Sequence, residues 1–321
     1  MVIDWYLLKS GILRLQPAPA TWPGGTMPRQ SESWFDVRDA DPESVRRFLA
    51  PFGLHPLALE RCATPANVPG VISYGPGILL DFPTGFERDA ATPSHVTMLL
   101  QGSVLLTIRR GSMPDLDALP RALMAEGAGP ILHLAQVVYE VLDALADPRV
   151  KAEIDLRDRL AGVSRAMDER PASVTAADLS QLHRQASALA SVIENQLYTV
   201  AALDAADNEV LRHPHRKAYI LDLISELELA QRGVYRLEGG VKDLDSAFQS
   251  ASSGRVERRL RILTIISAVT LPLGLIAGLL GMNVGGVPGI TNSHGFLIVV
   301  GLMAVIVAVE LWYFRRAGWF E

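Results

Sequence analysis

The sequence has 321 residues, of which 49% are hydrophobic, and a formal net charge of −5 at pH 7. This charge, together with the lack of a basic domain, excludes nucleic acid as an expected partner. The single cysteine, Cys62, excludes an internal disulfide framework and a paired-cysteine metal site. From Ile262 to Val309 the sequence contains no Asp, Glu, Lys or Arg, although charges are frequent before it. We therefore expect a water-facing portion followed by a membrane portion.

The first 125 residues predict a mixed α/β domain. Four runs rich in aliphatic and β-branched residues predict strands, at 33–37, 77–82, 95–100 and 104–110. The last two flank Gly102 and indicate a β-hairpin. A helix is expected after Asp41, because Asp is a good N-cap and Pro42 suits the first helical position. A second helix is expected to open at 54–60. The fold class that we expect is an α+β cytoplasmic domain continued by long stalk helices.

Residues 126–261 predict the helical stalk. Thr175 and Asp178 form a variant of the capping box, which marks the start of a helix. Apolar residues then recur at three- and four-residue steps from Leu179 to Val200, a pattern typical of a coiled-coil-like seam. The region between the α/β domain and the membrane is therefore expected to consist of long, mutually packed helices.

A second stalk helix is expected to begin near residue 216, because Pro214 breaks the first. The sequence contains no further proline until Pro272, so this helix is expected to run directly into the membrane. Gly239 and Gly240 interrupt its pattern. They mark either a hinge or a place where two helices pack closely, and we favour close packing.

Two apolar segments predict transmembrane helices, at 262–280 and 296–314. Each has about 19 residues and would rise roughly 28 Å, the thickness of a bilayer core. A buried helical hairpin in a soluble core is the alternative. Six arginines flank the two segments: Arg255, Arg258, Arg259, Arg261, Arg315 and Arg316. By the positive-inside rule, both termini and the tail 315–321 face the cytoplasm, and the loop 281–295 lies outside.

The loop carries the most specific motif. Gly281-Met282-Asn283 ends the first segment, and VGGVPG follows at 284–289. In this topology the tripeptide resembles the CorA superfamily of divalent-cation transporters, and VGGVPG resembles its zinc-transporter branch, ZntB. The resemblance also covers LHPLALE (54–60), LLTIRR (105–110) and RILTIISAVTLPLGLIAGLLGMN (261–283). Gly289 stands where the magnesium branch typically carries an acidic residue, so an acidic external ring is not expected.

The resemblance implies a homopentameric funnel in the bacterial inner membrane. The implied partners are further copies of the chain, membrane lipids and divalent cations. The first spans would line an axial pore, and the second spans would face lipid. One helix face carries mostly small or polar residues suited to this lining: Glu257, Leu260, Thr264, Ser267, Leu271 and Gly274. A plain helix-packing face is the alternative. Leu260, Leu263 and Leu271 are candidate hydrophobic constrictions, and Glu257 is a candidate carboxylate ring.

Asn283 is the candidate selectivity residue, in a selectivity loop with Gly281 and Met282. In a pentamer its five amide oxygens would accept hydrogen bonds from the waters around a cation and leave those waters in place. A helix cap in the left-handed conformation is the alternative role of Asn283. His294 is a second candidate for metal binding, because it lies in the external loop.

Asp222 and Glu226 are candidate regulatory acids between subunits, as the resemblance to the magnesium branch implies. No catalytic triad, phosphate loop or paired-carboxylate motif is evident, so no enzymatic activity is expected. No resident cofactor is expected, and the candidate cargo ions are Zn²⁺, Mg²⁺, Co²⁺, Ni²⁺ and Cd²⁺. The predicted function is zinc transport, for which the resemblance implies proton-coupled uptake. The alternatives are a Mg²⁺ or Co²⁺ channel of the CorA type and a membrane-anchored sensor without transport.

Overall fold

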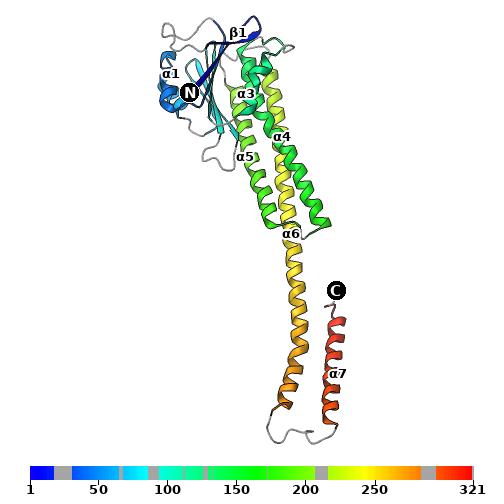
Figure 1. Cartoon of the computed structure of the whole chain (residues 1–321). Coiled ribbons are helices and arrows are strands. Elements are labelled where there is room, and N and C mark those ends of the chain that lie inside the picture. The colour runs from blue at the N-terminus through cyan, green and yellow to red at the C-terminus, as the bar shows by residue number, and fades with distance from the viewer. Residues whose placement is uncertain are drawn as a thin grey trace. The chain divides into compact units, whose positions relative to one another are not determined.

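The computed structural model describes residues 1–17, 31–64, 68–85, 94–110, 113–125, 129–131, 133–171, 173–206, 216–282 and 294–319. The chain divides into two compact units, Met1–Leu244 and Asp245–Glu321. Figure 1 shows that the first unit contains a sheet with helices packed on it, whereas the second consists of helices.

The first unit is built on a mixed sheet, which has seven strands in the described part of the chain. The strands are β1 (Val2–Lys9), β2 (Ile12–Gln16), β3 (Ser33–Arg38), β4 (Gly70–Tyr74), β5 (Gly77–Gly85), β6 (Ser94–Gln101) and β7 (Val104–Arg110). Their spatial order is β2-β1-β3-β7-β6-β5-β4. Neighbours pair antiparallel, except that β3 and β7 are parallel. The four predicted strands and the hairpin at Gly102 are confirmed, and β1, β2 and β4 join them.

Helices cover both faces of this sheet (Figure 1). One face carries α1 (Pro42–Leu49), the 3₁₀ turn η2 (Ala50–Phe52) and α2 (Pro56–Ala63). The other carries α3 (Pro114–Leu123), α4 (Leu134–Glu169), α5 (Ala176–Ala205) and the first part of α6 (Arg216–Leu280). Successive strand side chains point to opposite faces, so Phe35 packs with α1 and α2 whereas Trp34 packs with α3 to α6. The sheet and the long helices therefore share a core, and the predicted α+β class is confirmed.

Two helix starts show the caps that the sequence predicts. The backbone N–H of Ser44 donates to Asp41 Oδ1 at 2.9 Å, which caps α1. At the start of α5, the N–H of Asp178 donates to the Thr175 hydroxyl at 3.3 Å, and the N–H of Thr175 donates to Asp178 Oδ2 at 2.9 Å. Both caps are confirmed, and each satisfies N–H groups that a helix start leaves without an internal partner.

Two glycines of α6 allow close packing against α4. A Cβ atom on Gly233 would lie 2.5 Å from Glu153 Oε1, and one on Gly240 would lie 2.8 Å from Leu160 Cδ2. From the first contact to the second, the position moves seven residues toward the C-terminus in both helices, so α4 and α6 run parallel. A Cβ atom on Gly239 would meet nothing within 4 Å, and α6 continues through both glycines. The favoured interpretation, close packing instead of a hinge, is confirmed at Gly240.

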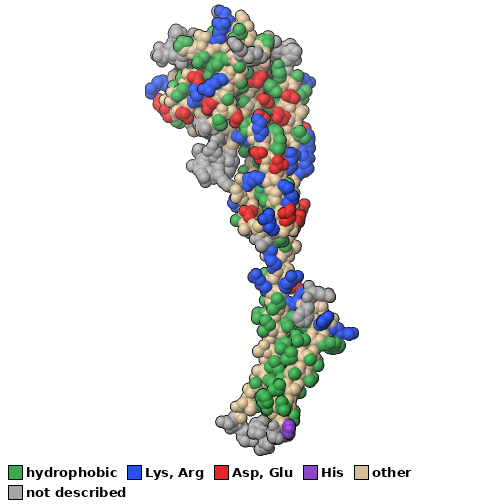
Figure 2. All heavy atoms as spheres, turned by 45° about the vertical axis from the view of Figure 1, so that its right-hand side comes forward, with side chains coloured by type: hydrophobic (Ala, Val, Ile, Leu, Met, Phe, Trp, Pro, Cys, Tyr) green, Lys and Arg blue, Asp and Glu red, His purple; other side chains and the backbone are tan. Residues whose placement is uncertain are grey.

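The second unit contains the last part of α6 and α7 (Gly295–Arg316). Both α6 and α7 include a segment that is long and apolar enough to cross a membrane. Pro272 lies inside α6 and does not end it. Figures 1 and 2 both show α7 beside the last part of α6, and Figure 2 shows that most side chains there are hydrophobic.

Candidate functional site

Within the second unit, α7 partly covers one face of α6. Half-buried residues mark this face: Ile265, Ala268, Val269, Pro272, Leu273, Ile276 and Leu280. They recur at three- and four-residue steps and so form one stripe along the helix. A matching half-buried stripe runs along α7, at Val299, Met303, Ile306, Val307 and Glu310. The membrane part of α6 therefore has one side that its own chain covers and one side that it leaves open.

The predicted pore-lining residues lie on the uncovered side. They are Glu257, Leu260, Thr264, Ser267, Leu271 and Gly274, and we call them the open face. They sit about half a turn around α6 from the stripe that faces α7. All six are exposed, and Leu271 exposes 72% of its surface. Leu260 and Leu271 are its large apolar members, and α7 leaves both uncovered.

The open face offers small and neutral polar groups. The Thr264 hydroxyl donates to the carbonyl oxygen of Leu260 at 2.9 Å, which leaves the lone pairs of Oγ1 available to accept from water. At Gly274 a Cβ atom would meet nothing within 4 Å. Glu257 is the acidic member of the face, and its Oε1 lies 3.2 Å from Nη2 of Arg261. The neutral groups of this surface can hydrogen-bond to the water around an ion, and Glu257 adds a carboxylate at one end of the face.

Gly281 and Met282 directly follow the end of α6. The N–H of Gly281 donates to the carbonyl oxygen of Ala277 at 2.9 Å, and a Cβ atom on Gly281 would lie 3.1 Å from that oxygen. A larger residue would therefore crowd the last turn of the helix. Met282 is exposed. The helix end thus places the first two residues of the GMN motif at the end of the open face.

Two further candidates lie at the loop. Asn283 and the VGGVPG motif at 284–289 lie outside the described residues. His294 immediately precedes α7, and its carbonyl oxygen accepts a hydrogen bond from the N–H of Ile298 at 3.2 Å. His294 is therefore fixed to the loop end of the second apolar helix.

The candidate regulatory acids Asp222 and Glu226 lie near acids of α4. Burial raises the pKa of Glu226, and the negative charges of Asp143 and Asp147 raise it further. Burial also raises the pKa of Asp143, and Asp147 and Asp222 add to the rise. The pKa of Glu140 is raised by burial and then by Asp143. We call these acids of α4 and α6 the acidic cluster: Glu140, Asp143, Asp147, Asp222 and Glu226.

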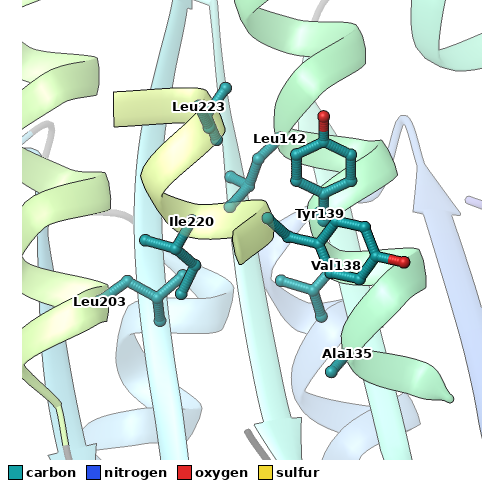
Figure 3. Close-up of a pocket in the computed structure, with 8 residues that line it drawn as sticks. Ala135, Val138, Tyr139, Leu142, Leu203, Ile220 and Leu223 are labelled. Carbon is teal, nitrogen blue, oxygen red and sulfur yellow. The ribbon is translucent and has the colours of Figure 1, made fainter. Parts of the chain in front are cut away.

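A tyrosine and a lysine flank the acidic cluster. The Tyr139 hydroxyl donates to Asp222 Oδ2 at 3.0 Å, and its ring stacks on Tyr219 with centroids 4.9 Å apart. Figure 3 shows Tyr139 among the residues that line a small cavity. The cavity has a volume of about 20 Å³, and apart from Tyr139 and Tyr219 its lining is apolar. This volume holds about one water molecule, so the cavity is too small for a substrate. Lys151 Nζ lies 2.5 Å from Asp147 Oδ2 and offsets part of the negative charge.

Sequence reasoning missed the α4 half of the acidic cluster. Residues 140, 143 and 147 are spaced by three and four, which places them on one helix face, but the spacing does not say which helix lies opposite. Among the residues that the structure describes, no three His, Cys, Asp or Glu side chains are placed to hold one metal ion together. Within one protomer the cluster is therefore a place of carboxylate repulsion, which a proton or a nearby cation would relieve.

The sequence matches the family model described as CorA-like Mg²⁺ transporter protein over residues 29–316. Similar proteins include YfjQ of Bacillus subtilis, which is 24% identical over 90% of this chain and 91% of that protein. The divalent cation transporter CmaX of Pseudomonas aeruginosa is 28% identical over 89% of this chain and 87% of that protein. The zinc transport protein ZntB of Yersinia enterocolitica is 23% identical over 90% of this chain and 84% of that protein.

Two solved structures share the fold. Full-length CmaX superposes with a TM-score of 0.78 at 21% identity, covering 98% of this chain and 96% of that one. The complete CorA magnesium transporter from Methanocaldococcus jannaschii gives a TM-score of 0.80 at 15% identity, covering 99% of both chains. Because the coverage is nearly complete, the likeness of fold includes the sheet, the long helices and both apolar C-terminal helices.

Proposed function

Because this chain belongs to the family of CorA-like Mg²⁺ transporter proteins, and so is a divalent-cation transporter, we propose that hydrated cations cross the membrane through the axial pore of its homopentamer. The chain is accordingly a transporter and not an enzyme. The observation that carries the proposal is the open face of α6, which α7 leaves uncovered although it covers the opposite side.

Five copies would bring five open faces together around one axis. The two apolar helices of a single protomer cannot enclose a pore, whereas a closed ring of identical copies can. Small residues such as Gly274 and Ser267 allow the helices to approach closely near the axis. The stripe of α6 that contacts α7 points the other way, so α7 would form an outer ring against lipid. This arrangement leaves no large apolar face exposed to water.

We propose that the cation keeps its first shell of water in this pore. Neutral oxygens on Thr264 and Asn283 accept hydrogen bonds from water and hold a divalent ion weakly enough to release it. Mg²⁺ in particular gives up its water reluctantly. A pathway for hydrated ions could therefore carry Mg²⁺ and Zn²⁺ alike. Leu260 and Leu271 would form apolar constrictions that close the pore when they exclude water.

Zn²⁺ is the cargo that we propose first. The VGGVPG motif at 284–289 supports it, because it resembles the zinc-transporter branch and has Gly289 instead of an acid. The similarity to a zinc transport protein points the same way. The second candidate is Mg²⁺ or Co²⁺, which the description of the matching family favours. The membrane-anchored sensor is the remaining alternative, and it predicts no ion flux.

We also propose that both termini lie in the cytoplasm and that the membrane is the bacterial inner membrane. The six arginines next to the apolar segments support this orientation through the positive-inside rule. Glu257 would then form a ring of carboxylates at the cytoplasmic mouth and attract cations. Asp222 and Glu226 would face the cytoplasm within the acidic cluster, where a divalent ion shared between subunits would relieve the repulsion and report its concentration.

Ion flux into liposomes that contain the purified full chain tests the proposal. Uptake of Zn²⁺ and of Mg²⁺ is measured with and without an inward proton gradient. We expect Zn²⁺ uptake, increased by the gradient. Thr264→Val removes one oxygen per subunit from the open face, and we expect uptake to fall at least about fivefold, the equivalent of one hydrogen bond.

Thr270→Val is the matched control, because the Thr270 hydroxyl makes the same bond, to the carbonyl oxygen of Ile266 at 2.8 Å, but lies outside the open face. Uptake by this variant should stay within twofold of wild type (about 0.4 kcal/mol). Mg²⁺ flux without Zn²⁺ flux would favour the channel alternative. A pentamer that carries neither ion would favour the sensor. If both threonine variants lost uptake equally, the open face would not be the side of α6 that lines the ion pathway.

A further inference from the structure

Six arginines gather where α7 ends beside α6. They are Arg255, Arg258, Arg259 and Arg261 on α6 and Arg315 and Arg316 on α7, and we call them the arginine collar. Arg261 pairs with Glu257, and the guanidinium of Arg316 lies 5.7 Å from the centre of the Trp312 ring. The other four arginines have no ion pair among the described residues. Figure 2 shows Lys and Arg side chains gathered next to the hydrophobic region of the helical pair.

Part of the arginine collar lies on the side of α6 that faces α7. Positions 255, 258 and 261 continue, in steps of three and four, the half-buried stripe that begins at Ile265 and Ala268. The open face follows a separate series of positions, beginning at Glu257 and Leu260. Arg255 and Arg258 therefore lie on the side of α6 that faces α7, whereas Arg261 reaches Glu257 of the open face.

The end of α7 is a fixed structure that carries the rest of the collar. Gly318 has a φ of +72°, and the N–H of Trp319 donates to the carbonyl oxygen of Phe314 at 3.1 Å. This is a Schellman motif, and its hydrophobic contact is present because the rings of Phe314 and Trp319 lie 5.2 Å apart. Trp319 is thereby folded back onto Phe314 of α7. Tryptophan prefers the interface between lipid tails and headgroups, so Arg315 and Arg316 lie at headgroup depth.

We propose that the arginine collar binds the phosphate groups of anionic phospholipids. A guanidinium presents a fork of N–H donors that fits two phosphate oxygens, and its aliphatic stem can lie along the apolar helix surface. A positive charge near an anionic leaflet gains about fivefold in affinity for each residue. Anionic headgroups would supply the missing partners of Arg255, Arg258 and Arg315. The binding does not depend on which ion the pore carries.

Competition between lipids tests this proposal on the purified full chain. The chain is placed in vesicles of phosphatidylglycerol and phosphatidylcholine, one of which carries brominated tails that quench nearby tryptophans such as Trp312 and Trp319. We expect wild type to prefer phosphatidylglycerol, with a preference that falls as salt rises because charges are screened. The variant Arg255→Gln/Arg258→Gln/Arg315→Gln should lower the preference at least tenfold.

Two further variants separate headgroup binding from other effects of charge. The same three positions changed to Lys keep the positive charge that orients the helices, and should keep most of the preference. A control triple, Arg46→Gln/Arg47→Gln/Arg184→Gln, removes equal charge from exposed positions on α1 and α5 and should change the preference by less than twofold.

Three outcomes would overturn the proposal. Wild type that binds both lipids equally at low salt would leave the collar a role in membrane orientation alone. A glutamine triple variant that still prefers phosphatidylglycerol as strongly as wild type would likewise limit the collar to membrane orientation. Dissociation of the oligomer in that variant, with unchanged lipid preference in the remaining copies, would assign the arginines to contacts between copies.

Discussion

Helix α6 belongs to both units, and its apolar residues meet opposite surroundings in the two. In the first unit, Leu227 and Val234 are fully buried against the sheet and the neighbouring helices. In the second, Leu260 and Leu271 expose 58% and 72% of their surfaces. All four side chains are aliphatic and all four lie on the same helix, so neither residue type nor helical geometry explains the difference in exposure. The first unit completes its core within one chain, whereas the second leaves apolar residues exposed, which lipid and further copies would cover in the proposed pentamer.

The sharpest test of this comparison truncates one leucine in each unit. Leu227→Ala should lower the free energy of unfolding by about 2–5 kcal/mol, because it leaves a cavity in a closed core. Leu271→Ala should leave the stability of the first unit unchanged and should alter ion flux instead. Denaturant unfolding of the full chain in detergent, followed by circular dichroism, measures the first effect. Equal destabilisation by the two variants would mean that the units do not differ in this way.

Adjacent glycines in α6 give a test with opposite signs. Gly240→Ala should destabilise the first unit by about 1–3 kcal/mol, because the new methyl group would overlap Leu160. Gly239→Ala should stabilise it by about 0.5–1 kcal/mol, because the site is open and Ala favours the helix. The difference in thermal midpoint between the two variants is the measurement. The same sign for both would contradict the packing assigned to Gly240.

The smallest expected effect comes from the acidic cluster. Folding raises the pKa of Asp143 and Glu226, so the folded state binds more protons than the unfolded state just above the usual carboxyl range. Stability should therefore fall as pH rises through that window and stay lower above it. Asp143→Asn should flatten this slope and stabilise the protein at neutral pH by less than about 1 kcal/mol, since solvent screens the cluster.

Thermal unfolding of the full chain at several pH values between 4 and 8 measures this slope. Asp155→Asn is the control, because Asp155 is an exposed acid of α4 outside the acidic cluster. A steeper slope after Asp143→Asn than after Asp155→Asn would contradict the repulsion inferred between α4 and α6.

Local sequence signals predicted many elements because their causes are local. Asp41 and Thr175 cap helices through bonds to residues three positions away, and Gly102 supplies the positive φ of its hairpin. The N-terminal hairpin was missed, although Ser10 and Gly11 form its turn with positive φ. Its strands lie at one edge of the sheet and are partly exposed, so their apolar pattern is weaker.

The sequence alone determined the two apolar segments, because bilayer thickness acts directly on residue order, and helical periodicity determined which residues share the open face. Only the tertiary structure decided which segments of the chain lie against one another. It placed β3 beside β7, brought Asp143 to Asp222 and turned the stripe at Ile265 toward α7. Such pairings depend on close packing between segments far apart in the chain, as at Gly233 and Glu153, and no local pattern encodes which surfaces meet.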